Sequence, residues 1–133
     1  MIVVDTNLLV YLYVRGQRTV QAEAVLRHDP AWAAPLLWRS EFRNTMVGLV
    51  RRQALRLEDA LRITEEAERG MAGLEYAVAS HEVLRLAAES GCSAYDCEFV
   101  SLARDLGLPF VTADRQVLAA FPSTAVTPDT FAA

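Results

Sequence analysis

The stretch Met1-Ile2-Val3-Val4-Asp5-Thr6-Asn7 brings an apolar run directly up to a carboxylate. Ile2, Val3 and Val4 are β-branched and do not alternate with polar residues, which is typical of a short strand buried on both faces in a parallel sheet. Asp5 then stands at the carboxyl end of that strand, where open α/β sheets bind their ligands. Asp, Thr and Asn also cap helices, so this turn taken alone is more typical of a helix N-cap than of a catalytic site.

The rest of the chain alternates short apolar runs with segments of helical periodicity. Strands are expected at Ala31–Ala34, Leu74–Val78, Pro109–Thr112 and Thr124–Val126. Apolar residues at helical spacing predict helices over Leu8–Tyr13, Val20–Leu26, Leu36–Arg52, Leu57–Arg69, His81–Glu89 and Tyr95–Leu106. Pro35 is expected to open one of these helices, and the tail from Thr127 to be loosely held. Because no hairpin signal separates the strands, the pattern predicts a parallel sheet with crossover helices.

Length and composition limit the classes of protein to consider. The 133 residues predict a single domain over residues 1–133, with an ordinary apolar fraction of 53%. No apolar run approaches the length of a membrane span, and Asp5 interrupts the N-terminus before a signal peptide could form. A cytoplasmic protein without a membrane partner is therefore expected. Cys92 and Cys97 fit no metal-ligand pair, so we expect both to be reduced.

The charge is acidic overall but unevenly distributed. The net charge is −4, and all 13 basic residues are Arg. An acidic surface repels nucleic-acid phosphates, which argues against such a partner at face value. Several arginines nevertheless crowd one region, at Arg39, Arg43, Arg51, Arg52 and Arg56. Arg binds phosphates bidentately, so this region fits an RNA contact about as well as a solvated helix face.

Three carboxylates fall where strands end or helices begin, and a fourth lies on a helix that follows a strand. Asp5, Asp96 and Asp114 each have an adequate explanation as helix caps, and Glu41 borders the packed side of its helix. Glu98 is expected to face solvent instead. Collected in one cleft, four acids would repel one another unless a hard cation such as Mg²⁺ or Mn²⁺ neutralised them. Water on such an ion is a nucleophile at neutral pH, and the ion also steadies charge on a phosphodiester.

Four segments in this order make the chain resemble the PIN domains, and within them the VapC-like toxins of toxin–antitoxin pairs. The segments are Asp5-Thr6-Asn7, Ser40-Glu41-Phe42-Arg43-Asn44, Tyr95-Asp96 and Val111-Thr112-Ala113-Asp114-Arg115. The resemblance implies a three-layer α/β/α fold with a central parallel sheet of four to five strands. It also implies a metal-dependent endoribonuclease, a homodimer, and a cognate antitoxin that blocks the site.

Site roles follow from the same resemblance. Mg²⁺, or Mn²⁺ in its place, would be held by Asp5, Glu41, Asp96 and Asp114. Residues that would orient these carboxylates are Thr6, Asn7, Asn44 and Thr112. Candidates for contact with the RNA substrate are Arg39, Arg43 and Arg115. The chain departs from many relatives after Asp114, where Arg115, Gln116 and Val117 replace a further acid or Asn, so the number of metal ions stays open.

Other phosphate chemistries on parallel sheets fit less well. A receiver domain needs a Lys, and the chain has none. A haloacid-dehalogenase-type phosphatase needs a second Asp where Asn7 stands, and neither Gly-rich nucleotide motif occurs. His28 and His81 lack a convincing nucleophile partner. The alternative from a different class is a catalytically silent PIN-fold module for binding or dimerisation, because the presence of four acids does not establish turnover.

Overall fold

The structure is a computed structural model that describes residues 1–133. Its strands are β1 (Ile2–Val4), β2 (Trp32–Pro35), β3 (Glu75–Tyr76), β4 (Phe110–Val111) and β5 (Ala125–Val126). Its helices are α1 (Thr6–Tyr13), α2 (Thr19–His28), α3 (Leu37–Arg51), α4 (Leu57–Gly70), α5 (Ser80–Ser90), α6 (Ala94–Leu106), α7 (Arg115–Ala120) and α8 (Pro128–Ala132). Most of the predicted strands and helices are therefore present, with ends that differ by a few residues.

A single sheet of five parallel strands runs through the molecule in the order β3-β2-β1-β4-β5. The N-terminal strand β1 lies at its centre and pairs with β2 on one side and β4 on the other. Ile2, Val3 and Val4 are all buried, as the unbroken apolar run predicts for a strand covered on both faces. Asp5 therefore leaves the sheet from its middle.

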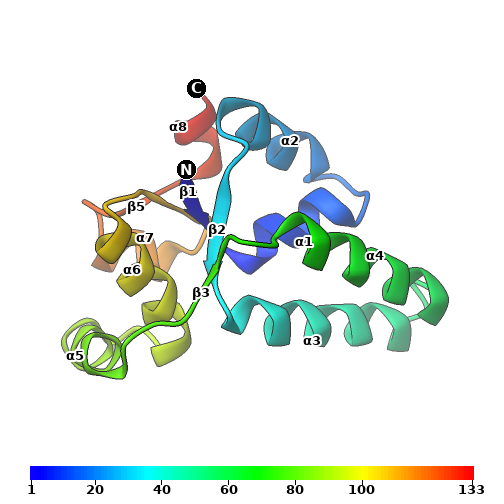
Figure 1. The fold of residues 1–133 in the computed structure, drawn as a ribbon. Coiled ribbons are helices and arrows are strands. Elements are labelled where there is room, and N and C mark those ends of the chain that lie inside the picture. The colour runs from blue at the N-terminus through cyan, green and yellow to red at the C-terminus, as the bar shows by residue number, and fades with distance from the viewer.

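Helices cover both faces of the sheet in a three-layer arrangement (Figure 1). Helices α1, α3 and α4 pack together on one side, with α2 and α8 packed against each other beyond α1. On the other side α6 crosses β1, β2 and β4, and α5 packs against α6. The sequence-based prediction of a three-layer α/β/α fold with a parallel sheet is confirmed.

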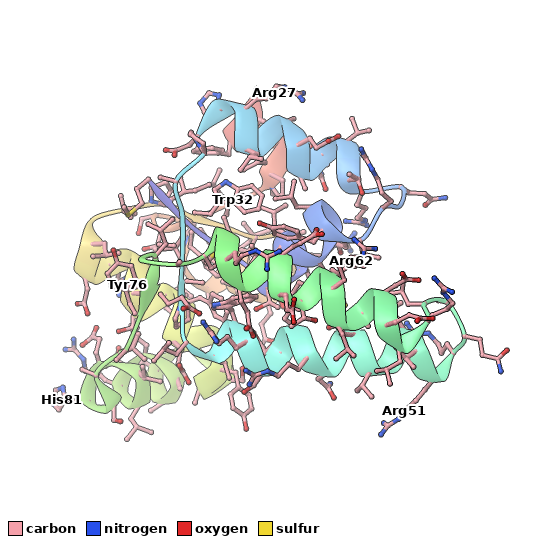
Figure 2. The ribbon with its side chains drawn as sticks, turned by 45° about the vertical axis from the view of Figure 1, so that its right-hand side comes forward. Arg27, Trp32, Arg51, Arg62, Tyr76 and His81 are labelled. Carbon is pink, nitrogen blue, oxygen red and sulfur yellow. The ribbon has the colours of Figure 1, made fainter.

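The core is aromatic as well as aliphatic. Trp38 and Phe42 on α3 are fully buried and meet edge to face, with ring centroids 5.5 Å apart. Phe99 on α6 stacks on Phe110 of β4 at the same centroid distance of 5.5 Å. Trp32 is buried among the side chains, whereas Arg27 and Arg51 project from the periphery (Figure 2). The Phe99–Phe110 contact packs α6 against the sheet, whereas Trp38 and Phe42 form the buried face of α3. Both helices carry acids expected at the site.

Two local expectations were wrong. Pro35 does not open a helix but ends β2 opposite Tyr76, and Leu36 resumes hydrogen bonding by donating its N–H to the Tyr76 carbonyl. The segment after Thr127 is not loose, because it forms α8, in which Pro128 is buried. No helix combines the length and the apolar character that crossing a membrane requires.

Candidate functional site

The pairing of β1 with β4 brings two residues of the candidate site together. Val4 lies opposite Val111, so the next residues, Asp5 and Thr112, leave the sheet side by side. The Thr112 hydroxyl donates a hydrogen bond of 2.6 Å to Asp5 Oδ2 and accepts one of 3.1 Å from the N–H of Asp114. Thr112 is buried, so this hydroxyl has few other partners and orients Asp5 relative to Asp114.

Glu41 reaches the same place from the middle of α3. The buried hydroxyl of Thr6, the first residue of α1, donates a hydrogen bond of 2.7 Å to Glu41 Oε1. Glu41 is itself partly buried, as its place beside the packed stripe of α3 suggested. Thr6 and Thr112 thus each hold one carboxylate, and both were among the residues expected to orient the acids.

The remaining two acids stand at helix starts. Asp114 caps α7 by accepting a hydrogen bond of 3.0 Å from the Val117 N–H. Asp96 lies in the first turn of α6, where its own N–H donates 3.0 Å to the cap residue Ser93. Asp5 occupies the cap position of α1 without a capping bond from its side chain. Helix N-termini favour negative charge, which is one reason acids can gather here.

These acids line one wholly polar cavity, which we call the acidic cavity. Its volume is about 260 Å³, which leaves room for a cation and several waters. No hydrophobic residue lines it; its lining residues are Asp5, Thr6, Asn7, Glu41, Asn44, Thr45, Asp96 and Asp114. Thr45 is the one residue of this set that the sequence did not mark as a site residue, although it lies one turn after Glu41 on the same face of α3.

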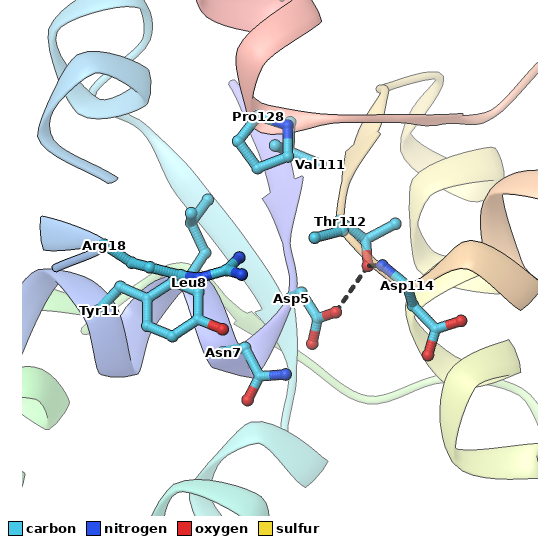
Figure 3. Close-up of a pocket in the computed structure, with 10 residues that line it drawn as sticks. Asp5, Asn7, Leu8, Tyr11, Arg18, Val111, Thr112, Asp114 and Pro128 are labelled. Atoms are coloured by element: carbon cyan, nitrogen blue, oxygen red, sulfur yellow. Dashed lines mark hydrogen bonds between the residues drawn. The ribbon is translucent and has the colours of Figure 1, made fainter. Parts of the chain in front are cut away.

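A second hollow, the adjoining cavity, continues from the first (Figure 3). The two cavities share Asp5, Asn7 and Asp114. The further lining residues of the adjoining cavity are Leu8, Tyr11, Arg18, Val111, Thr112, Ala113 and Pro128. The sequence did not point to Tyr11 or Arg18, because nothing local relates the turn after α1 to the end of β4. The only available signal was that Asn7 and Tyr11 are four residues apart and so share one face of α1.

Burial, and after it the crowding of like charges, raises the pKa values of the acids in the site. Burial raises the pKa of Asp5 above its ordinary 3.8, and the nearby Asp114 adds to the rise, although the Thr112 hydrogen bond opposes it. Burial likewise raises the pKa of Glu41 above 4.5, with further contributions from Asp5 and Asp96. The pKa of Asp96 is raised by burial and by Asp114. In each case the ionised form is disfavoured, which is the situation that a bound cation relieves.

The donor set suits a hard divalent cation. Carboxylate, hydroxyl and amide oxygens are the ligands that Mg²⁺ and Mn²⁺ prefer, and no thiol or imidazole lines the acidic cavity. No three of these carboxylates are arranged so that they could ligate one ion together. A cation would therefore have to draw them together or retain several of its waters, as Mg²⁺ commonly does.

The three arginines expected to contact RNA line neither cavity. Arg39 forms a bidentate pair with Glu75, at 2.6 and 2.9 Å, and also lies 3.5 Å from Glu68. Arg43 lies 3.6 Å from Glu68, and Arg115 is exposed beside Asp114. Arg39 thus joins α3 to α4 and β3, and an RNA contact by these side chains stays a prediction.

Glu98 differs from the expectation of full exposure. It is partly buried on α6 beside an apolar hollow that includes Leu36 and Tyr76, and burial raises its pKa. Its charge raises the pKa of Glu41, although Glu98 does not line the acidic cavity. It therefore adds to the negative field of the site from outside.

Comparison with known families settles the relationship of the chain. The family model of the PIN domain matches residues 2–122. The chain belongs to the PIN domain family. One curated relative of this PIN domain is Ribonuclease VapC3 of Pyrobaculum aerophilum, which is 32% identical over 130 residues, covering 96% of this chain and 98% of the relative.

Solved structures support the same fold. The crystal structure of PAE2754 from Pyrobaculum aerophilum superposes on this PIN domain with a TM-score of 0.77 and 24% identity, covering 98% of this chain and 92% of the other. A toxin–antitoxin complex from Klebsiella pneumoniae superposes with a TM-score of 0.68 and 18% identity, covering 96% and 98%. At these identities the structural likeness establishes the fold alone.

Proposed function

We propose that this PIN domain is a metal-dependent endoribonuclease that acts as the toxin of a toxin–antitoxin pair. One observation carries the proposal: four acids from four separate parts of the chain line a single cavity that contains no hydrophobic side chain. Core packing does not require such a cavity, and burial, together with repulsion between the acids, raises the pKa values of three of them. The similarity to a protein named Ribonuclease VapC3 supports RNA as the substrate.

Mg²⁺ is the proposed cofactor, with Mn²⁺ as a substitute. Asp5, Asp96 and Asp114 are the proposed ligands, since they approach the acidic cavity from β1, α6 and the end of β4. The bound cation would neutralise these acids, favour ionisation of the attacking water and offset charge on the phosphodiester.

The protein's own residues would orient the carboxylates and accept a proton from the attacking water. Thr112 holds Asp5 by its hydroxyl, and Thr6 holds Glu41 in the same way. Glu41 is proposed to accept the proton of the attacking water, because a raised carboxylate pKa makes it a stronger base near neutral pH. Leaving Thr6 in place while removing the Glu41 charge, as Glu41→Gln does, would separate this role from the packing of α3.

The test compares cleavage of structured RNA by the wild type, Asp5→Asn and Asp96→Asn, with Mg²⁺ and with a chelator. We expect the wild type to cut only with Mg²⁺ and each variant to lose more than about 100-fold in rate, since even residues that merely orient metal ligands cost 10–100-fold. Equal cleavage by all three proteins would contradict the proposal.

A matched control is available on the helix that carries Asp96. Asp105 is exposed near the opposite end of α6 and lines neither cavity, so Asp105→Asn should cleave like the wild type. If the wild type bound RNA but cut none of the RNAs offered, the silent binding module would become the better description.

A partner protein follows from the toxin proposal. The Klebsiella pneumoniae neighbour was solved as a toxin–antitoxin complex, which supports an antitoxin as a partner of this chain. Family likeness also suggests a homodimer. Co-purification with the product of the adjacent reading frame, followed by light scattering with and without it, measures both associations.

A further inference from the structure

A single basic side chain, that of Arg18, faces the acidic residues from across the adjoining cavity. The Arg18 guanidinium lies over the Tyr11 ring, 5.4 Å from its centroid. Figure 3 shows Arg18 and Tyr11 together on one side of Asn7 and Asp5, and Asp114 on the other side. The guanidinium points toward the cavity. Arg18 is the only basic residue that lines either cavity.

The turn that carries Arg18 is built to hold this position. Thr19 is buried, and its hydroxyl donates to the Tyr11 carbonyl at 2.7 Å while accepting from the Gly16 N–H at 3.0 Å. These bonds tie the start of α2 to the end of α1. These bonds hold the backbone next to Arg18 close to Tyr11, and the exposed Arg18 side chain is placed by the contact of its guanidinium with the Tyr11 ring.

The charge of Arg18 is also uncommitted. Many arginines in the molecule are paired with a carboxylate. One of them is Arg15, which lies on the same turn as Arg18 and is 3.7 Å from Glu23 of α2. Arg18 forms no ion pair, although Asp5 shares its cavity. A guanidinium that is stacked on an aromatic ring and has free N–H groups is well arranged to bind a phosphate through two hydrogen bonds.

We infer that Arg18, supported by Tyr11, binds a backbone phosphate of single-stranded RNA next to the phosphodiester that lies over the carboxylates. This inference rests on the proposed function. The RNA strand would then run along the adjoining cavity. Arg18 would hold one backbone phosphate at one end, and the neighbouring phosphodiester would lie over the carboxylates at the other end. Tyr11 is then a positioning residue, because it acts through the guanidinium.

The test measures binding of a short fluorescein-labelled single-stranded RNA by fluorescence anisotropy, in Mg²⁺ and over a range of salt concentrations. Glu41→Gln serves as the parent protein so that the RNA stays intact. Adding Arg18→Ala should weaken binding about tenfold, as expected for loss of a charged hydrogen-bonded contact. It should also reduce the slope of log affinity against log salt by about 0.7, the value for one phosphate on a single strand.

Variants on the same turn and ring separate binding from folding. Arg15→Ala removes an exposed charge outside the cavities and should leave affinity nearly unchanged. Arg18→Lys should retain the salt slope but lose part of the affinity, since Lys lacks the planar fork. Tyr11→Phe should bind like the parent, and Tyr11→Leu should weaken binding, because only the ring supports the guanidinium.

The outcomes distinguish this inference from the proposed function. Equal affinity and salt slope for the parent and Arg18→Ala would overturn the inference even if the wild type cleaves RNA. Binding that depends on Arg18, in a protein that never cleaves, would uphold the inference and reject the nuclease. A parent that binds no RNA would overturn both.

Discussion

Thr112 is the residue on which the geometry of the candidate site most depends. Its buried hydroxyl links Asp5, at the end of the central strand, with the backbone of Asp114. The hydrogen bond lowers the pKa of Asp5 against the stronger effect of burial. One side chain therefore both orients the carboxylate and favours its ionised form.

Replacing Thr112 by Val keeps the shape of the side chain but removes this hydrogen bond. We expect the free energy of unfolding to fall by about 1–3 kcal/mol, because a buried acceptor loses its partner. The pKa of Asp5 rises further, so the acid limb of the pH profile for RNA cleavage moves to higher pH. Thr112→Ser should restore both properties, and an unchanged profile in Thr112→Val would contradict the assigned role.

At the scale of elements, α8 shows how a short helix can depend on its neighbour. Phe131 meets His28 of α2 edge to face with centroids 4.8 Å apart, and Asp129 accepts a hydrogen bond of 2.9 Å from Gln21. Thr127 caps the helix by accepting from the Thr130 N–H at 3.1 Å. These contacts with α2 supply what five residues cannot supply alone.

Phe131→Ala should lower the free energy of unfolding by about 1–2 kcal/mol, since it removes a partly buried ring and an aromatic pair. Thermal denaturation followed by circular dichroism measures the change. Thr130→Ala, at an exposed position of the same helix, should stay within about 0.5 kcal/mol of the wild type. Equal midpoints for all three proteins would instead mean that the tail is loosely held after all.

The sequence predicted those elements whose signals are local. The β-branched run of β1 and the apolar stripes of α3 and α6 can each be recognised from the local sequence. The four acids and two threonines could be listed because each follows a strand or lies on such a helix. The helix α8 and the ends of β2 could not be predicted, since they depend on α2 and on pairing with β3.

The side chains that were misjudged or missed are those whose partners lie far away in the chain. Arg39, near the start of α3, pairs with Glu75 of β3 because β3 lies beside β2, and its own sequence neighbourhood does not reveal this. Arg18 reaches the site only because α2 turns back along α1. Charge partners across a fold are set by tertiary geometry, so local patterns identify an arginine but not its function.

At the scale of the whole molecule, the gathered acids make stability depend on pH and, under the proposed function, on metal. The pKa values of Asp5, Glu41 and Asp96 are raised in the folded protein above 3.8, 4.5 and 3.8. The folded state therefore binds protons more tightly than the unfolded state in the range above these values. Their contribution to stability is fully present below about pH 4 and is lost as pH rises through the folded pKa values.

Asp5→Asn isolates this effect. Without metal, the stability of the wild type relative to Asp5→Asn should fall as pH rises from about 4 to 7, which urea denaturation at several pH values measures. Adding Mg²⁺ at 100 times its dissociation constant should stabilise the wild type by about 2.7 kcal/mol, and Asp5→Asn by less. If the difference in stability between the wild type and Asp5→Asn changed with neither pH nor Mg²⁺, Asp5 would not be part of a cation site.

The central position of β1 bears on when the protein becomes active during its own synthesis. Asp5 is separated by 107 residues from Thr112, whose hydroxyl orients it, and the strand β4 that flanks β1 comes directly before Thr112. A nascent chain can pair β1 with β2 before Asp96 and Asp114, two of the four acids that line the acidic cavity, have been synthesised. The proposed nuclease would therefore be unable to cut the message and the ribosome that are producing it before Asp114 has been added to the chain.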